Sequence, residues 1–549
     1  MQQFDAVILS LVVLVALSTF EGKVKFPFPI LLVLTGAILG LIPQFPILML
    51  DPEVVFLVFL PPLLFDAASR TSWHDFRKDI LPISTLAIAL VFFTTVTVAL
   101  AAYYFIPGFT WPLAFLLGAI VSPPDAVAAT GITKGLGINK RVVTIIEGES
   151  LVNDASALIG YRFALIAVNT GSFVLWQAGL QFLLLVAGGI LCGIATGYIF
   201  VWMHKKITHN SITSTSLTLL TPFVSYMLAE RLHVSGVLAV VCTGLFIAWR
   251  SPKIFSYQTR IRSKSVWDTL IYILNGFIFL LIGQQLPDAL KELEAYSLLV
   301  LLAYGFMISA MVIVVRIVWV FATAFSHKLI WGDAKTSGAT ELQDKSATTW
   351  KNVLIVAWTG TRGIVSMATA LALPLTLKGG ALFPHRSLIL FLTFVVIFVT
   401  LVIQGMSLPV MIRILGVKPN WRSDNEEKEL QKFVLQSTLY FIEHEFPIPL
   451  EDSIKRQIKA AYEQTLGQLQ RKTKEGKILQ SANLDEEPWL TVPVAPILLA
   501  QVEISKFRRE LLLRLHKDSR YNYQSIRKLE QQLDRDDLNL NDDLKRADE

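Results

Sequence analysis

The chain has 549 residues, of which 53% are hydrophobic and 17% are charged. Ordinary soluble domains are less apolar and more charged. Apolar runs of about 20 residues, long enough to cross the hydrocarbon core of a bilayer, recur through residues 1–420. The formal net charge of +6 combines +9 in residues 1–420 with −3 in residues 421–549. The positive excess therefore lies in the loops between apolar runs and does not indicate nucleic-acid binding. The recurring apolar runs predict an all-α polytopic membrane protein.

The N-terminus carries Asp5 and no basic residue before its apolar run, which predicts a retained first span and not a cleaved signal peptide. The two cysteines, Cys192 and Cys242, fall inside apolar runs. We interpret them as packing residues without a disulfide framework.

Hydropathy predicts about thirteen membrane spans. Twelve or fourteen spans are the alternatives, because residues 212–231 are rich in Ser and Thr and the gap to the next span is very short. The expected spans are residues 4–20, 27–42, 53–69, 80–106, 112–133, 142–168, 172–203, 212–231, 234–249, 266–287, 297–325, 350–376 and 387–415.

Loop charges give an independent check on this count. Nineteen Lys and Arg residues lie in the odd-numbered loops and four in the even-numbered loops. Positive residues favour the cytoplasmic side of a membrane. The alternation supports thirteen spans, with the N-terminus outside and the C-terminus in the cytoplasm.

Residues 1–418 are expected to form the membrane domain and residues 419–549 a helical cytoplasmic tail. A Pro-containing linker is expected at residues 487–496 and an acidic, frayed end at residues 534–549. No catalytic pattern stands out in the tail, and a folding or dimerisation role is as good an interpretation as a regulatory one. Apolar residues recur in it at helical spacing, at Ile454, Ile458, Ala461, Tyr462, Leu466 and Leu469, and at Val502, Ile504, Phe507, Leu511 and Leu515.

The fifth predicted span contains Ser122-Pro123-Pro124-Asp125. Two consecutive prolines remove two backbone donors and clash with the preceding turn, so the helix must break here. Broken helices at membrane depth line cavities, and their half-helix ends bind ions through free carbonyl and amide groups. Asp125 lies at the break and is either an ion ligand or a cap for the second half-helix.

The sixth predicted span contains three carboxylates, within residues 147–154. Charged groups at that depth cost several kcal/mol unless they are paired or hydrated, so the cluster predicts a functional site. The helical period places Glu147, Ser150 and Asp154 on one face and Glu149 and Asn153 on a second. The first face, opposite the aspartate of the broken fifth span, offers hard oxygen ligands for a small cation.

Glu149 needs a cationic partner, because an unpaired buried carboxylate is costly. The candidate is Arg362, which lies between glycines in the twelfth span. This span occupies the place in the second half of the chain that the broken fifth span occupies in the first. Spans one to six and eight to thirteen would form an inverted repeat linked by the seventh. Glu147 either lines an ion entrance or is a solvated residue in the first turn.

Five motifs follow one another along the membrane region, Pro61-Pro62-Leu63-Leu64-Phe65-Asp66, Ser122-Pro123-Pro124-Asp125, Gly148-Glu149-Ser150-Leu151-Val152-Asn153-Asp154, Thr361-Arg362-Gly363 and Gln404-Gly405. In order and spacing they resemble the motifs of the sodium/proton exchangers of the monovalent cation–proton antiporter superfamily. The resemblance covers residues 1–415 and does not extend to the tail.

The resemblance implies that Asp154 is the transport carboxylate, which binds a cation or a proton. Asp125, Ser150 and Asn153 would complete or orient the site with a main-chain carbonyl, and Asp154, Asp125 and Ser150 would be the Na⁺ ligands. Glu149 and Arg362 would form a structural ion bridge. The Asn-Asp pair implies one-for-one electroneutral exchange, as in bacterial-type Na⁺/H⁺ antiporters.

The same resemblance implies a homodimer in the cell membrane, with a mobile core domain that moves like an elevator. Spans one to three and seven to ten would form the dimerisation part, and spans four to six and eleven to thirteen the core. The lipid bilayer, the cation and the proton are the other expected partners, and we expect no cofactor and no nucleic acid.

Some residues depart from the family's pattern. Pro-Pro-Asp-Ala replaces the Asp-Pro or similar pair common at the break, and Glu147 replaces an apolar residue. Arg162 is an unexpected charge that either snorkels outward or pairs with Asp66. The isolated charges Arg316, Glu230 and Asp66 are expected simply to pair within the bundle, and among them Asp66 has the best claim to an accessory role.

The sequence therefore predicts a secondary active antiporter that exchanges Na⁺, or Li⁺ or K⁺, for H⁺ by alternating access at Asp154, and not an enzyme. A K⁺/H⁺ antiporter is the main alternative, since two carboxylates and a hydroxyl do not fix an ionic radius. An ion channel on the same broken helices is disfavoured because no carbonyl-ring filter motif is visible. A sodium-sensing membrane protein that signals through its tail ranks third.

Overall fold

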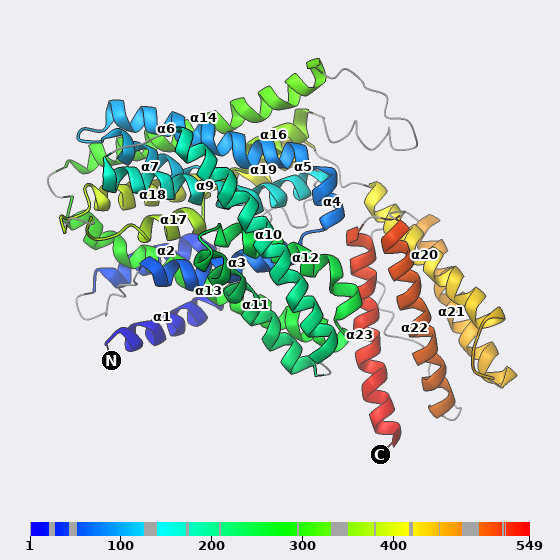
Figure 1. The fold of residues 1–549 in the computed structure, drawn as a ribbon. Coiled ribbons are helices and arrows are strands. Elements are labelled where there is room, and N and C mark those ends of the chain that lie inside the picture. Colours follow the sequence, from blue (N-terminus) through cyan, green and yellow to red (C-terminus); the bar gives the residue numbers. More distant parts are fainter. Residues whose placement is uncertain are drawn as a thin grey trace. The chain divides into compact units, whose positions relative to one another are not determined.

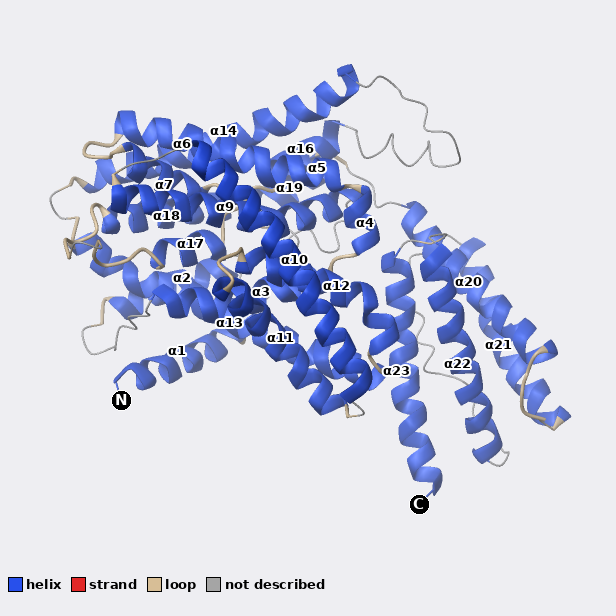
Figure 2. Cartoon of the chain, in the orientation of Figure 1, coloured by secondary structure: helices blue, strands red, loops and turns tan. Residues whose placement is uncertain are grey.

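A computed structural model of the full chain describes residues 2–20, 23, 28–42, 52–125, 140–171, 175–207, 210–293, 296–330, 350–377, 380–416, 421–449, 451–474, 494–518, 521 and 523–548. Over these residues the structure consists of helices and loops, without a strand (Figure 2). The all-α prediction is confirmed.

Two of the helical segments are π-helical turns, named η1 and η2, and the others are α-helices. In chain order they are α1 (Gln2–Ser18), α2 (Phe28–Gly40), α3 (Pro52–Arg70), α4 (Trp73–Lys78), α5 (Ile80–Ser84), η1 (Thr85–Leu90), α6 (Val91–Phe105), α7 (Trp111–Val121), α9 (Lys140–Thr170), α10 (Leu175–Ile207), α11 (Ser211–Arg231), α12 (Gly236–Ile254), α13 (Tyr257–Lys291), α14 (Leu298–Ile330), α16 (Trp350–Trp358), α17 (Ile364–Leu371), α18 (Arg386–Thr400), η2 (Leu401–Gly405), α19 (Met406–Ile414), α20 (Trp421–His444), α21 (Asp452–Lys474), α22 (Val494–Asp518) and α23 (Tyr523–Asp548).

Eight helical segments of the described chain are long and apolar enough to cross a membrane, and α1, α2 and α7 contain shorter apolar helices. The polytopic architecture is therefore confirmed, while the count of thirteen spans stays a prediction. The eight segments are Ile80–Phe105, Arg141–Thr170, Gly179–Lys206, Ser211–Arg231, Gly236–Ile254, Tyr257–Lys291, Leu298–Phe325 and Arg386–Ile414.

Two helices are interrupted where the sequence predicts it. α7 ends at Val121, one residue before the two prolines, and the rest of the fifth predicted span, residues 126–133, lies outside the described residues. α16 ends at Trp358 and α17 begins at Ile364, with non-helical backbone between them. The two breaks meet, because the Asp125 amide donates a 2.7 Å hydrogen bond to the Thr361 carbonyl.

The helices of the membrane region pack in a pattern that places these breaks. α7 packs against α6 and α9, and α14 packs against α18, α16 and α6. α11 packs against α10 and α3, and α3 also contacts α17 and α9. Figure 1 shows α6 and α7 side by side, with α9 next to them. The long helix α9 therefore contacts both broken helices, through α7 and through α16 and α17, and also packs against α5, η1 and α6.

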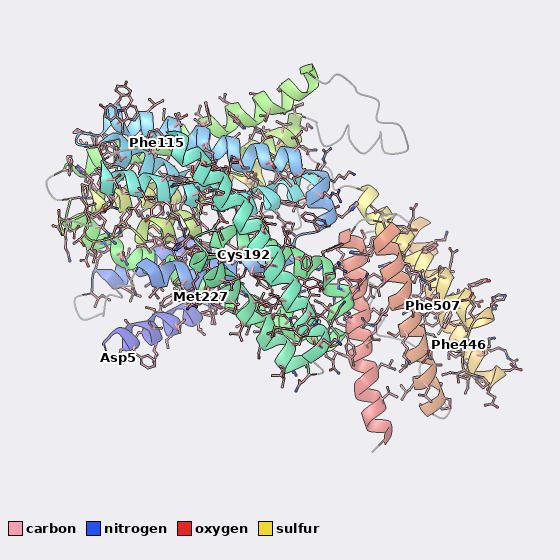
Figure 3. The ribbon with its side chains drawn as sticks, in the orientation of Figure 1. Asp5, Phe115, Cys192, Met227, Phe446 and Phe507 are labelled. Carbon is pink, nitrogen blue, oxygen red and sulfur yellow. The ribbon has the colours of Figure 1, made fainter. Side chains whose placement is uncertain are left out.

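The chain divides into two compact units, one of residues 1–251 and 263–419 and one of residues 252–262 and 420–549. In the second unit α20, α21, α22 and α23 pack together (Figure 1). The rings of Phe441 and Phe507 stack there with centroids 4.2 Å apart, and Phe446 lies edge-on to Phe441. Figure 3 labels Phe446 and Phe507 in this unit. The predicted tail is helical, and its cytoplasmic location stays a prediction.

The expectation of a frayed end at residues 534–549 is wrong. α23 continues to Asp548, and Asp534 is buried. Its carboxylate accepts a 2.8 Å hydrogen bond from Nε of Arg260 and lies 2.9 Å from Nη2 of Arg509. Two guanidinium groups neutralise a charge that the sequence alone assigns to solvent. The expected linker at residues 487–496 lies outside the described residues as far as residue 493.

Glu530 lines a cavity of about 270 Å³ in the second unit, together with Arg260 and Arg509. Burial raises the pKa of the Glu530 carboxyl above its ordinary value, against the opposing effect of Arg260, and the nearby charge of Asp534 raises it further. Arg527 and Arg509 also oppose the shift. The charged form of Glu530 is therefore disfavoured by folding.

The sign of this effect gives a prediction. A carboxyl whose folded pKa exceeds its unfolded value stabilises the fold below the unfolded pKa, about 4.3, and this contribution is lost as the pH rises through the folded pKa. Glu530→Gln should therefore slow hydrogen exchange in α22 and α23 of the full chain at neutral pH and flatten its dependence on pH. Glu510→Gln, which changes an exposed carboxylate of α22, is the control. Equal exchange in Glu530→Gln and the unsubstituted chain would contradict the prediction.

Candidate ion-binding site

The sixth predicted span is the single continuous helix α9, so the face assignments made from the sequence apply. Asp154 is 7% exposed and Asn153 is fully buried. Ser150 lies one turn before Asp154 and is half-buried. Glu147 is half-buried two residues before Glu149, and its role at an ion entrance stays a prediction.

Asp125 holds the two helix breaks together. Its carbonyl accepts a 3.1 Å hydrogen bond from the Thr361 hydroxyl, and its Oδ2 accepts one of 3.3 Å from the amide of Ile364, the first residue of α17. A carboxylate at this position satisfies a free amide and complements the positive end of the helix dipole. A Cβ added at Gly363 would overlap this carboxylate, so the close approach requires glycine. Asp125 thus caps α17 of the other broken helix, while the second half-helix of its own span, which it was expected to cap, lies outside the described residues.

Asn153 joins α9 to the first break. Its Nδ2 donates a 2.7 Å hydrogen bond to the carbonyl of Pro124. Its Oδ1 is buried without a hydrogen-bond partner among the described residues. The carboxylates of Asp154 and Asp125 are close enough to interact electrostatically. Carboxylate and amide oxygens gathered at a break are ligands suited to a small hard cation.

The prediction that Arg362 is the ion-pair partner of Glu149 is wrong. Arg316 of α14 binds the Glu149 carboxylate with both terminal nitrogens, at 2.5 Å and 2.8 Å. Both side chains are 1% exposed. Arg316 also donates to the carbonyl of Val356 near the end of α16, at 3.1 Å from Nη2. A planar guanidinium satisfies a carboxylate and a helix-end carbonyl at once.

Arg362 has a different task at the broken helices. Its Nε donates to the carbonyl of Val121 at 3.2 Å, its Nη2 to that of Ser122 at 3.5 Å, and its Nη1 to that of Gly360. Its amide donates to the hydroxyl of Thr400 at 3.1 Å. The last carbonyls of a helix have no intrahelical partner, and a cation there complements the dipole. Arg362 therefore caps α7 and the non-helical segment before α17.

One of the two alternatives for Arg162 is wrong. Arg162 does not pair with Asp66, because its Nη2 lies 2.6 Å from the carboxylate of Glu230 on α11. Asp66 accepts 2.8 Å hydrogen bonds from Nε of Arg70, one turn away on α3. The expectation that Glu230 and Arg316 pair within the bundle is confirmed.

Sequence reasoning missed the importance of Arg316. The available signal was its isolation, since it is the one charged residue in the apolar run 298–325. A lone arginine at membrane depth requires a carboxylate partner. By this reasoning either Arg316 or Arg362 could be the partner of Glu149, and the sequence does not decide between them.

The chain matches the sequence profile of the family described as "Sodium/hydrogen exchanger, transmembrane" over residues 8–414. Together with the apolar helices, the broken helices and the buried carboxylates, this match identifies the class of protein as a multi-pass membrane transporter. The chain belongs to the sodium/hydrogen exchanger family, within the monovalent cation–proton antiporters.

Individual relatives agree with this assignment. The chain is 32% identical over 421 residues to a sodium, potassium, lithium and rubidium/H⁺ antiporter of Bacillus pumilus, covering 75% of this chain and 61% of that protein. It is 30% identical over 464 residues to the Na⁺/H⁺ antiporter ApNhaP of Aphanothece halophytica, covering 84% and 82%. The solved structure of the sodium proton antiporter MjNhaP1 from Methanocaldococcus jannaschii has the same fold, with a TM-score of 0.55, 19% identity, and coverage of 76% and 100%.

The Glu149–Arg316 pair gives a stability prediction. Glu149→Gln leaves a buried guanidinium without its counter-charge and should lower the stability by about 3–5 kcal/mol, seen as a lower melting temperature in detergent. A second substitution, Arg316→Met, should recover much of this loss because it removes the unpaired charge. Arg362→Met in place of Arg316→Met is the matched control. Recovery by the Arg362 substitution would contradict the pairing.

The contact at Gly363 gives a second prediction. Gly363→Ala should displace the Asp125 carboxylate from the end of α17 and lower the stability by about 1–3 kcal/mol, as overpacking does. Gly179→Ala on α10 is the control, since an added Cβ meets nothing within 4 Å there. Thermal unfolding of the two variants in one detergent makes the comparison. Equal melting temperatures would show that the contact is dispensable.

Proposed function

We propose that the chain is a secondary active antiporter that exchanges a monovalent cation, Na⁺ in the first place, for H⁺ by alternating access at Asp154. One observation carries this proposal: Asp154 is buried on α9 directly after Asn153, whose amide binds the Pro124 carbonyl where two broken helices meet. The relatives from Bacillus pumilus and Aphanothece halophytica, both named as antiporters, support it.

Competition for one carboxylate couples the two ions. A proton and a cation exclude each other from Asp154, so release of one permits binding of the other. With either ligand the carboxylate is neutralised and can cross a low-dielectric barrier, whereas the empty charged site crosses it with difficulty. Alternating exposure of the site to the two sides then links the two gradients. Ser150, one turn away on the same face, is the expected hydroxyl ligand.

The surrounding charges favour one-for-one electroneutral exchange. Glu149 is neutralised by Arg316, and Asn153 carries no charge. Asp125 is engaged by the amide of Ile364. Asp154 is then the carboxylate whose charge changes during the cycle, so one bound cation replaces one proton.

We extend the proposal to the assembly and its orientation. The N-terminus lies outside and the tail in the cytoplasm, as the loop charges favour. The moving core consists of α5–α9 and α14–α19. The part that forms the homodimer consists of α1–α3 and α10–α13. The packing of α14 on α18, α16 and α6, and of α11 on α10 and α3, supports this division.

The relative from Bacillus pumilus is named as an antiporter of sodium, potassium, lithium and rubidium. A K⁺/H⁺ exchanger is therefore the second candidate. The chemistry of the oxygens accepts any of these ions. A proteoliposome assay that follows luminal pH while each cation is added in turn, with and without an imposed membrane potential, separates these possibilities. Electroneutral antiport gives a saturable pH change that the potential does not alter, whereas a channel gives a flux that follows the voltage.

Asp154 is the residue whose loss should abolish exchange. In the same assay Asp154→Asn should give cation-dependent proton movement no greater than that of protein-free liposomes, because an amide binds neither ion in exchange for the other. Asp288→Asn, which alters an exposed carboxylate paired with Lys291, is the control and should exchange normally. Retained exchange in Asp154→Asn would remove Asp154 from the mechanism.

A further inference from the structure

Arg162 is a charged residue of α9 that the proposed mechanism leaves unused. Its Nη2 lies 2.6 Å from Oε1 of Glu230 on α11. Tyr226, one turn before Glu230, lines the same small cavity as Arg162. This ion pair joins the helix that carries Asp154 to a helix that packs against α10 and α3.

The pair lies on a stripe that leads away from the ion site. Asp154, Leu158 and Arg162 are spaced four residues apart on α9, so they follow one face over a rise of about 12 Å. Leu158 and Arg162 line a cavity of about 30 Å³ together with Tyr226. Such a space holds one or two water molecules. It is too small for a hydrated cation to pass.

The first turn of α12 holds Glu230 in position. A Cβ added at Gly236 would lie 2.8 Å from the ring of Tyr226 and 2.9 Å from Oε1 of Glu230. The preceding amide, of Ser235, donates a 3.3 Å hydrogen bond to the carbonyl of Leu185 on α10. The carboxylate therefore belongs to the packed group of α10, α11 and α12.

The residue next to Arg162 faces the opposite group. The hydroxyl of Tyr161 donates a 3.1 Å hydrogen bond to the carbonyl of Ala372, directly after α17. Two neighbouring residues of α9 thus bind to different neighbours, Tyr161 to the broken-helix group and Arg162 to α11. A movement of α9 together with α17 relative to α11 would keep the Tyr161 contact and break the Arg162 pair.

The strength of the pair suits a contact that opens repeatedly. The Arg162 and Glu230 side chains are 42% and 32% exposed, whereas both members of the Glu149–Arg316 pair are 1% exposed. A partly exposed pair contributes little net free energy, while breaking an enclosed pair costs several times more. The Glu149–Arg316 pair is thus suited to remain closed, whereas the Arg162–Glu230 pair is suited to open and close.

We propose that Arg162 and Glu230 form a gate that closes the path between Asp154 and the C-terminal end of α9. This inference rests on the proposed antiport, because a gate has a purpose only where Asp154 is exposed to one side at a time. The two residues position helices and do not bind the transported ion. Tyr226 and the first turn of α12 hold the Glu230 half of the gate in place.

Thiol labelling tests the gate without depending on exchange. Leu158→Cys, in a chain with Cys192→Ala and Cys242→Ala, places one thiol in the cavity. A membrane-impermeant thiol reagent is added to either face of native membrane vesicles in separate experiments. Adding Glu230→Gln or Arg162→Gln should raise the labelling rate up to about fivefold from one face only, as expected for loss of a partly exposed ion pair. Unchanged melting temperatures show that the fold is intact.

Two further variants make the result specific. The swap Arg162→Glu with Glu230→Arg should restore slow labelling, because it rebuilds the pair with reversed charges. Asp268→Asn breaks the comparable 2.6 Å pair with Arg70 and should leave labelling slow. Unchanged labelling in the single variants, equal acceleration in Asp268→Asn, acceleration from both faces, or a swap that stays fast would each overturn the gate. A chain that labels as expected but exchanges no ions in proteoliposomes would instead refute the proposed function.

Discussion

Free backbone groups at broken helices are the constraint on which the rest of this structure depends. Within a bilayer a carbonyl or amide without a partner costs several kcal/mol, so each half-helix end must be satisfied by protein. Arg362 covers the carbonyls that end α7, Arg316 covers one near the end of α16, and Asp125 accepts from the amide that begins α17. The charges that make this region look costly in the sequence are thus the groups that allow two helices to break side by side.

The same contacts distinguish two carboxylates of α9. Glu149 and Asp154 are only five residues apart on α9, yet their surroundings differ. Glu149 is fixed by a bidentate guanidinium, whereas Asp154 lies near another carboxylate and an amide oxygen without a partner. Fixed charges around the site hold the local field constant while one group changes its charge. The electroneutral proposal follows from this division between braced and variable carboxylates.

The sequence predicted those features that depend on local rules. Two adjacent prolines must break α7, and the helical period separates Glu149 from Asp154. The choice of partners was not local. Arg316 and Arg362 are both buried arginines, and only the crossing of α14, α16 and α9 brings the former to Glu149. The helical end of the tail was missed for the same reason, because acidic composition indicates solvent unless a distant guanidinium, here that of Arg260, is known to meet Asp534.

The contacts of Arg316, Arg362 and Arg162 differ in burial, and this difference orders the three residues by function. Arg316 and Arg362 are enclosed and bind carbonyls as well as charge, so moving either would expose several unsatisfied groups together. Arg162 binds the side-chain carboxylate of Glu230 and is partly exposed. Opening this contact leaves one guanidinium and one carboxylate that water can solvate. A transporter that moves one group of helices past another needs rigid contacts within each group and separable contacts between them. α9 carries both kinds, with Glu149 bound rigidly near one end and Arg162 bound weakly toward the other, and Asp154 lies between them.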